Sequence, residues 1–291
     1  MNRIEQQAML LTDFKKYLES EHKSPHTIRG YLLNIQLYRK WFKTSFGKPP
    51  EKLYRENILE FRSYLIQVVQ QNARTINHKL SSLRKYNEFL IEQGVQKDMA
   101  VLQKDMMKIQ QSYASPTTIT EQDVKAFMQE VLEHETKRDY ALVVLMAYTG
   151  VRISEALDVK LSDFNLQSGE CIIRSGKGAK QRIVPLNNRV VEVLGEYLKF
   201  RDNYKKASIS DFLFVSKDSI RLNRTVVNDM FNRHSDTITP HQLRHFFCTN
   251  ALEKGLGIHE VANIAGHTNI HTTMIYTNPD RNKLKQKMDL L

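Results

Sequence analysis

Residues 170–186 read ECIIRSGKGAKQRIVPL, and this stretch carries the clearest β signal in the chain. Glu170 to Ser175 predicts a short strand, and 176–178 (Gly-Lys-Gly) predicts a turn. The alternating side chains of Lys180 to Leu186 predict a strand that returns alongside the first. The stretch is therefore a β-hairpin, with the flexible amine of Lys177 at its tip.

The sequence on both sides of this hairpin is helical by pattern. Apolar residues recur at helical spacing around 10–18, 28–42, 58–68 and 76–90, and four such helices can close a small bundle. Ser24 and Pro25 open the second helix as N-cap and first residue. Further helices are predicted from Thr120, over 137–148, and at about 187–204, 225–234, 240–254 and 258–265. The fold class is mainly α, with an N-terminal helical bundle and a mostly helical second domain that contains the small hairpin.

The length of 291 residues predicts two domains. A polar stretch over roughly Gln110 to Thr118, which contains Ser112, Ser115 and Pro116, has the composition of a linker. The expected division is a helical domain over 1–110, a linker over 111–119 and a second domain over 120–291. Tyr31 and Trp41, in the first domain, are most simply core residues.

The chain is basic, with 43 Lys and Arg against 32 Asp and Glu and a net charge of +11. Residues 1–115 carry +8 of this excess and residues 116–291 carry +3. The excess favours a polyanionic partner, above all nucleic acid gripped through its phosphates. The two cysteines exclude a disulfide-rich scaffold, and the sequence has no apolar run long enough to span a membrane and no signal peptide. A reducing cytoplasm fits these features.

Few classes of reactive centre fit the sequence. It contains neither a glycine-rich phosphate loop nor the serine elbow of a hydrolase. His241 and His245, like His267 and His271, are four residues apart and could face one way on a helix. Each pair lacks the nearby glutamate of a zinc site, and Arg244 beside the first pair would repel a cation. No metal and no cofactor is expected.

Basic and aromatic residues form a better candidate site. Arg152 lies in the turn that follows Gly150, and His241 and Arg244 share a face at the start of a helix, which suits an anion. His267 follows Gly266, a predicted helix end. Tyr276 lies nine residues further on and can converge with His267 only if the chain breaks between them. Taken singly, each of these residues also has an ordinary structural role, such as an ion pair between Arg152 and Glu155.

Four motifs in order carry a family resemblance. They are 149–157 (TGVRISEAL), 176–186 (GKGAKQRIVPL), 241–245 (HQLRH) and 266–276 (GHTNIHTTMIY). On these motifs the chain resembles the tyrosine recombinases of the phage-integrase and Xer-like kind, possibly a transposon-encoded resolvase. The N-terminal helices, with Ser24-Pro25-His26-Thr27 before Tyr31, resemble that family's SAM-like core-binding domain. Ala265 and Asn278 depart from the family pattern without removing a catalytic group.

The resemblance implies a mechanism. Arg152 and Arg244 would bind the non-bridging oxygens of a DNA phosphodiester, and His267 would hydrogen-bond it. Tyr276 would be the nucleophile, with His241 as the base and Lys177 as the acid for the leaving 5′-oxygen. Glu155 would support by orienting Arg152 or His241. The product would be a 3′-phosphotyrosine link, from which strand exchange proceeds through a Holliday junction.

The resemblance also implies partners and a setting. The partner would be double-stranded DNA with a specific core site, bound by a homo-tetramer on paired sites. The tail after Tyr276, with Leu284, Met288, Leu290 and Leu291, would dock into a neighbouring protomer, although it could also fold back on its own domain. The expected location is the cytoplasm, in association with the nucleoid, for a protein encoded by a bacterium or by a mobile element. A resolvase or Xer-like role is favoured over integration because no arm-binding domain is evident.

Two alternatives stay open on the sequence. One is a topoisomerase of type IB, which uses the same nucleophile for relaxation, and the Xer-like helical domain disfavours it. The other is a DNA-binding protein without catalysis, and the complete set of six catalytic groups argues against it.

Overall fold

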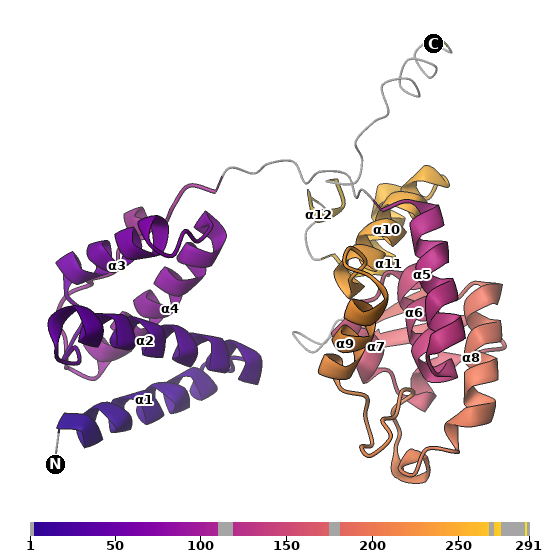
Figure 1. Ribbon diagram of the computed structural model, residues 1–291, viewed down its shortest axis with the longest axis horizontal. Coiled ribbons are helices and arrows are strands. Elements are labelled where there is room, and N and C mark those ends of the chain that lie inside the picture. Colours follow the sequence, from indigo (N-terminus) through magenta and orange to yellow (C-terminus); the bar gives the residue numbers. More distant parts are fainter. Residues whose placement is uncertain (1–2, 110–118, 175–180, 268–270, 275–288, 290–291) are drawn as a thin grey trace. The chain divides into compact units, whose positions relative to one another are not determined.

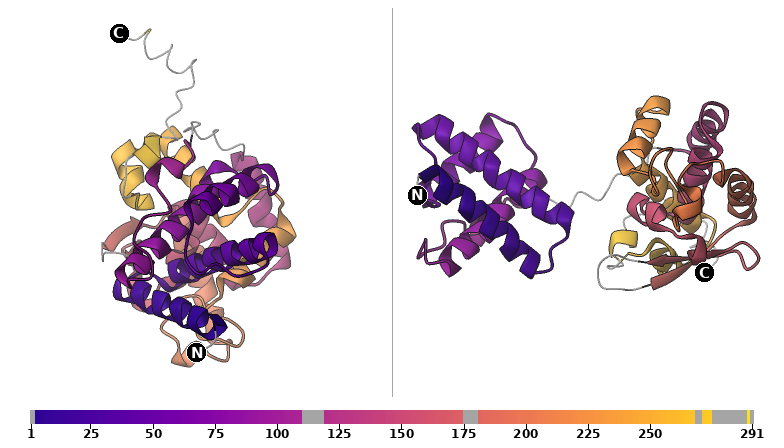
Figure 2. Two further views of the ribbon diagram at one scale, coloured as in Figure 1. Left: turned by 90° about the vertical axis from the view of Figure 1, so that its left-hand side faces the viewer. Right: turned by 90° about the horizontal axis from the view of Figure 1, so that it is seen from below.

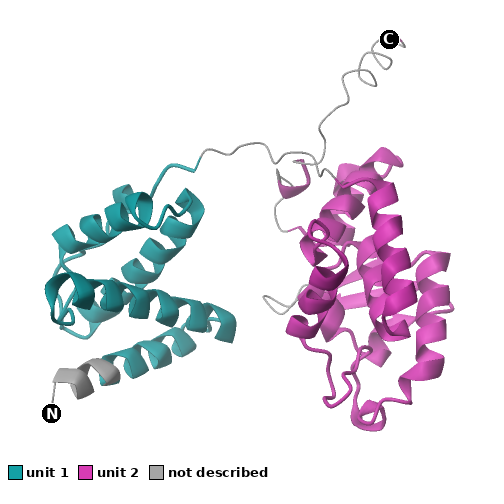
Figure 3. Cartoon of the chain, viewed as in Figure 1, with its two compact units in different colours: residues 1–111 teal, residues 112–291 magenta. Residues whose placement is uncertain are grey.

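The computed structural model describes residues 3–109, 119–174, 181–267, 271–274 and 289. Its chain forms two compact units, residues 1–111 and 112–291 (Figure 3). Lys177, Tyr276 and the apolar residues of the tail lie outside the described residues. Among the residues described, no helix is long and apolar enough to cross a membrane.

The first unit is helical. Its helices are α1 (Arg3–Ser20), α2 (Pro25–Phe46), α3 (Arg55–Gln67) and α4 (Ala73–Glu92), followed by a 3-10 turn η1 (Gln103–Asp105). As predicted, Ser24 caps α2 by accepting a hydrogen bond from the backbone of Thr27, and Gly47 ends α2 with a φ of +72°. Helix α2 packs against the other three helices, and the core between them is apolar and rich in aromatic rings.

Tyr31 and Trp41 pack against this core but are only partly buried. The prediction that they belong to the core therefore holds in part. The segment after α4 is tied down by Asn87, which is fully buried and accepts hydrogen bonds from the backbone of Ala100 and Val101. A buried amide with its partners satisfied fixes the position of this polar segment.

The second unit is built around α6. Its helices are α5 (Glu121–His134), α6 (Lys137–Thr149), α7 (Ile153–Asp158), α8 (Asn188–Arg201), α9 (Arg224–His234), α10 (Pro240–Glu253), α11 (Ile258–Ala265) and α12 (His271–Met274), with 3-10 turns η2 (Leu161–Asp163) and η3 (Ala207–Ile209). Helix α6 is buried almost throughout and packs against α5, α7, α8 and α10 (Figure 1). This burial explains its nearly continuous apolar sequence, which lacks a polar face.

The predicted hairpin is present as two antiparallel strands, β2 (Glu170–Arg174) and β3 (Gln181–Pro185). A third strand, β1 (Phe164–Asn165), pairs with β2 and completes a small sheet at one edge of the unit (Figure 2). The sequence did not predict β1, because two residues are too few to show alternation. Cys171 lies opposite Val184 in the register, and both side chains are buried.

The predicted helices are otherwise confirmed, with ends that differ by a few residues. Thr120 caps α5 in a reciprocal hydrogen-bonded box with Asp123, and Thr239 caps α10. The exceptions are α7, a six-residue helix where the sequence predicted only a turn, and the four-residue α12, which the sequence did not predict. So short a helix is below the length at which apolar periodicity can be read.

Gly150 connects α6 to α7, and a substitution at this residue tests how closely α10 packs against the connection. Its φ is +62°, and a Cβ built there would collide with the ring of Phe247 on α10. Gly150→Ala should therefore combine backbone strain of about 1–2 kcal/mol with about 1–3 kcal/mol of overpacking. Gly255→Ala is a matched control in the same unit, since Gly255 also has a positive φ, +96°, and its Cβ would meet nothing within 4 Å.

Unfolding in urea followed by far-UV circular dichroism should show the larger loss of stability for Gly150→Ala. Trp41 is the only tryptophan of the chain and belongs to the first unit. Its fluorescence should therefore change at the same urea concentration in both variants as in the unmodified protein. Equal destabilisation by the two alanines would contradict the close packing of Phe247 on Gly150.

Candidate active site

The turn between α6 and α7 positions the first arginine of the candidate site. Gly150 ends α6 in the left-handed conformation, and Arg152 is the N-cap residue of α7. The backbone N–H of Arg152 donates to Oε2 of Glu155 at 2.9 Å, which is the usual first-turn contact of a helix that begins one residue later. The guanidinium of Arg152 stays partly exposed, with 43% of its side chain accessible.

Glu155 is the centre of an ion-pair network. Its Oε1 accepts from the guanidinium of Arg152 at 2.8 Å, and its two oxygens accept from the two Nη atoms of Arg182 at 3.1 and 2.6 Å. Burial opposes ionisation of this carboxyl, but the hydrogen bonds from Arg182 and from the backbone of Arg152 outweigh it, so its pKa lies below the usual 4.5. Of the two supporting roles expected for Glu155, the structure shows the contact with Arg152.

Arg182 is a residue that the sequence did not single out. It lies on β3 opposite Ile173, on the inward face that Val184 and Cys171 also occupy. Its Nε donates to the carbonyl of Ile264 at 2.8 Å, so it ties the sheet to the end of α11 as well as to α7. Alternation along β3 places Arg182 on the buried face of the strand, and a cation on that face needs a partner.

Gly266 ends α11 in contact with this network. Its φ is +69°, and a Cβ built there would lie 2.5 Å from an Nη of Arg182. Its carbonyl accepts from the second Nη of Arg152 at 2.9 Å. Glycine is needed here both for the turn and for the approach of the guanidinium, which confirms the predicted helix end.

Arg244 lies on α10 and is 95% buried, with a relative exposure of 5%. One Nη donates to the carbonyl of Gly150 at 2.6 Å. The other Nη is buried and has no hydrogen-bond partner in the part of the chain that the structure describes. Burial, and after it the charge of Arg152, lowers the pKa of Arg244 from 12.5 to about 10.

Three histidines stand around these cations. His241 and His245 lie one turn apart on α10 with their Nε2 atoms 2.7 Å apart, and Nδ1 of His267 lies 2.7 Å from the hydroxyl of buried Thr273. Burial and then nearby positive charge lower the pKa of all three: that of His241 falls below 6.5, and those of His245 and His267 fall to about 4. All three rings are therefore neutral at pH 7.

The described residues thus bring four candidates into one cluster, Arg152, His241, Arg244 and His267. Arg152 and Arg244 each contribute to the lowered pKa of both His241 and His267. Lys177 and Tyr276 lie outside the described residues, but α11 and α12 are separate helices, so the required break after Gly266 is present. Within the described ranges, no group of three or more His, Cys, Asp or Glu side chains could hold a metal ion.

The chemistry of this cluster favours an anion. It combines one carboxylate with three guanidiniums, and one buried Nη points at no partner among the residues described. A phosphodiester would supply the missing acceptors, and the preorganised donors would stabilise the extra charge of a pentacoordinate phosphorus.

Both parts of the chain match models of known protein families. Residues 117–283 match the phage integrase family, and residues 11–94 match the phage integrase N-terminal SAM-like domain. The TnP I resolvase of Bacillus thuringiensis is 59% identical over 96% of this chain and 98% of its own length. The tyrosine recombinase XerA of Thermococcus kodakarensis is 30% identical over 92% of this chain and 90% of its own length.

Solved structures share the fold. The XerH recombinase bound to palindromic difH in a post-cleavage complex has a TM-score of 0.70 at 23% identity, covering 90% of this chain and 78% of that one. A lambda integrase dimer on a COC′ core site also has a TM-score of 0.70, at 17% identity over 93% of this chain and 95% of that one.

The family match and the two sequence relatives define an enzyme that breaks and rejoins DNA. The chain belongs to the phage integrase family and is a tyrosine site-specific recombinase.

The lowered histidine pKa values predict how stability depends on pH. In the unfolded chain His245 and His267 take up protons near pH 6.5, but in the folded chain only near pH 4. The unfolded state therefore binds more protons between these values, and stability is lost as the pH falls from 6.5 towards 4. The free energy of unfolding, measured in urea at pH 7.0, 5.5 and 4.5, should decrease at each step.

His245→Gln should make this decrease shallower, while His259→Gln, at an exposed position on α11, should leave it as in the unmodified chain. An identical pH dependence for His245→Gln and the unmodified protein would contradict the burial of a neutral ring.

Proposed function

We propose that the chain is a resolvase that recombines paired DNA sites of a mobile element, with the cluster around Arg152 and Arg244 as its phosphate-binding site. The observation that carries this proposal is the buried Nη of Arg244, which has no hydrogen-bond partner among the described residues and is held next to a second guanidinium. Two cations that lower each other's stability in the free protein are stabilised when an anion binds between them. The scissile phosphate is the anion that a DNA recombinase offers.

The proposed reaction is the one that the family resemblance implies, and the residue types suit it. The hydroxyl of Tyr276 attacks the phosphorus, its proton passes to His241, and the bond from phosphorus to the 5′-oxygen breaks as Lys177 protonates that oxygen. His241 suits the role of base because its lowered pKa keeps it neutral at pH 7. Arg152, Arg244 and His267 hydrogen-bond the non-bridging oxygens, and Glu155 holds Arg152 in place.

Rejoining needs no energy-rich cofactor. The phosphotyrosine conserves the energy of the broken phosphodiester, so attack by the 5′-hydroxyl of a partner strand reseals the DNA. Two rounds of this exchange pass through a Holliday junction.

The partner is double-stranded DNA with a core site. In this proposal the first unit grips the duplex through its phosphates, which accounts for the net charge of +8 in residues 1–115. Four copies act on two sites in the cytoplasm, at the nucleoid, with the tail of each docked on its neighbour. The resolvase role rests on the 59% identity with the TnP I resolvase across nearly the full length of both chains.

A duplex core site with a nick close to the cleavage position tests the chemistry. Cleavage then releases a short strand that carries the 5′-hydroxyl, so the covalent intermediate cannot be resealed. The unmodified protein should form a protein–DNA adduct that survives denaturing electrophoresis, and Tyr276→Phe should form none while it binds the same DNA. Arg244→Ala should slow adduct formation by about 10²–10³-fold, the typical cost of removing a donor to a developing charge.

Each outcome separates the candidate functions. DNA binding without an adduct would leave only a catalytically silent binding protein, and an adduct with Tyr276→Phe would reassign the nucleophile. Relaxation of supercoiled DNA without recombinant product would favour activity like that of a type IB topoisomerase.

A further inference from the structure

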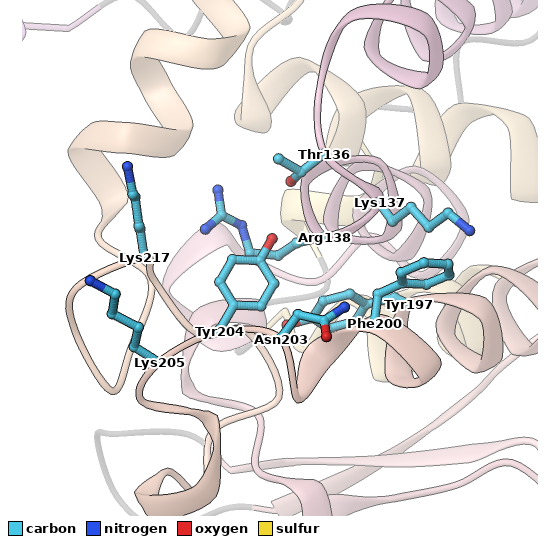
Figure 4. A pocket seen from close by; sticks show the side chains of 9 residues that line it. All are labelled: Thr136, Lys137, Arg138, Tyr197, Phe200, Asn203, Tyr204, Lys205 and Lys217. Atoms are coloured by element: carbon cyan, nitrogen blue, oxygen red, sulfur yellow. The ribbon is translucent and has the colours of Figure 1, made fainter.

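A cavity of about 450 Å³ opens in the second unit beside the N-terminal end of α6 and the C-terminal end of α8. Figure 4 shows its lining, which combines three aromatic rings, four cations and two small polar side chains: Tyr197, Phe200, Tyr204, Lys137, Arg138, Lys205, Lys217, Thr136 and Asn203. Its volume lies in the range of small-molecule sites, roughly 300–1,000 Å³.

This cavity is separate from the recombination site. Thr136 and Lys137 are at the first turn of α6, whereas Gly150 and Arg152 follow its last turn. Thirteen helical residues separate the two ends, about 20 Å at the rise of an α-helix. One phosphate cannot contact both places, so the cavity has no part in the proposed chemistry.

The aromatic residues give the cavity flat walls. Tyr197 is fully buried at its base, and its hydroxyl donates to the carbonyl of Leu213. Phe200 is 41% exposed, with the ammonium of Lys137 only 3.5 Å from its ring centroid. The guanidinium of Arg138 lies 5.5 Å from the ring of Tyr204. Rings that are partly exposed and flanked by cations are platforms on which a planar group can stack.

The charges around these walls are not balanced. Arg138 is satisfied by Asp139 and by the carbonyl of Val215, and Lys137 lies 4.0 Å from Glu196. Lys205 and Lys217 are exposed and form no ion pair with a carboxylate of the described residues. In Figure 4 both amines lie on the same side of Tyr204, away from Lys137 and Phe200. The cavity therefore has a stacking side and a side that favours an anion.

We infer that this cavity binds a nucleotide, with the base against Phe200 and Tyr204 and the phosphate at Lys205 and Lys217. A nucleotide joins a flat ring to a negative charge, as these two sides of the cavity require, and a nucleotide is a small molecule of the kind that cavities of this volume bind. Asn203 and Thr136 supply polar groups for the base or the sugar. The nucleotide comes either free in solution or from an unpaired stretch of a DNA strand, since both offer the same chemistry.

Two probes distinguish these sources, dAMP and the single-stranded tetranucleotide dT₄ with a fluorescent label. Titration of the full-length Tyr276→Phe protein should show binding of at least one of them below about 1 mM, the affinity of a weak specific site. Binding of dAMP identifies a free nucleotide as the ligand, and binding of dT₄ alone identifies a DNA strand.

The double variant Lys205→Gln/Lys217→Gln should weaken that binding at least tenfold. Lys206→Gln is the matched control, because Lys206 is an exposed neighbour that does not line the cavity, and it should change binding less than twofold. Both variants made in the catalytically intact chain should form the covalent adduct on a nicked core site at the unmodified rate, which shows that they are folded.

Equal binding by the double variant and the Lys206→Gln control would overturn the inference. So would the absence of binding for both probes at 1 mM. Binding of an acidic, tyrosine-containing peptide in their place would assign the cavity to a protein partner and would also overturn it.

Discussion

The candidate site depends on one interaction, the contact of the Glu155 carboxylate with Arg152 and Arg182. It joins α7, β3 and, through Gly266 and Ile264, the end of α11, which are segments far apart in the sequence. Only 9% of the Glu155 side chain and 14% of that of Arg182 are exposed. Removing one partner of so buried a pair leaves an uncompensated charge, at a cost of about 3–5 kcal/mol. The network therefore fixes the place of the partly exposed guanidinium of Arg152.

The same network leaves an excess of positive charge. Glu155 neutralises only part of the charge of the three arginines. Burial is the largest cause of the lowered pKa of Arg244 and of the three histidines, and the positive charge that remains nearby lowers these pKa values further. Contacts with Gly150 and Gly266 hold the guanidiniums close together, because Arg244 donates to the carbonyl of Gly150 and Arg152 to that of Gly266. A site of this kind stabilises an anion at small cost in reorganisation, because its donors are already aligned.

The sequence predicted most of the fold, because long helices with caps and a strand pair around a Gly-Lys-Gly turn have patterns that can be read locally. It did not predict α7, α12 or β1, which are too short for periodicity. Arg152, His241, Arg244 and His267 emerged from ordered motifs, and the structure brings them together. Arg182 could not be identified from the sequence motifs. Its importance depends on its contacts with Glu155 and Gly266, which lie far from it in the sequence and are brought close only by the tertiary structure.

The most direct test of the network is the rate of covalent adduct formation by Glu155→Gln, measured in a single turnover on a nicked core site. If Glu155 acts by holding Arg152, the rate falls about 10²-fold, the cost of a misplaced catalytic group, while the dissociation constant for the same DNA changes less than threefold. Glu253→Gln, at an exposed position at the end of α10, should leave both unchanged. Adduct formation by Glu155→Gln at the rate of the unmodified chain would contradict the central place of this carboxylate.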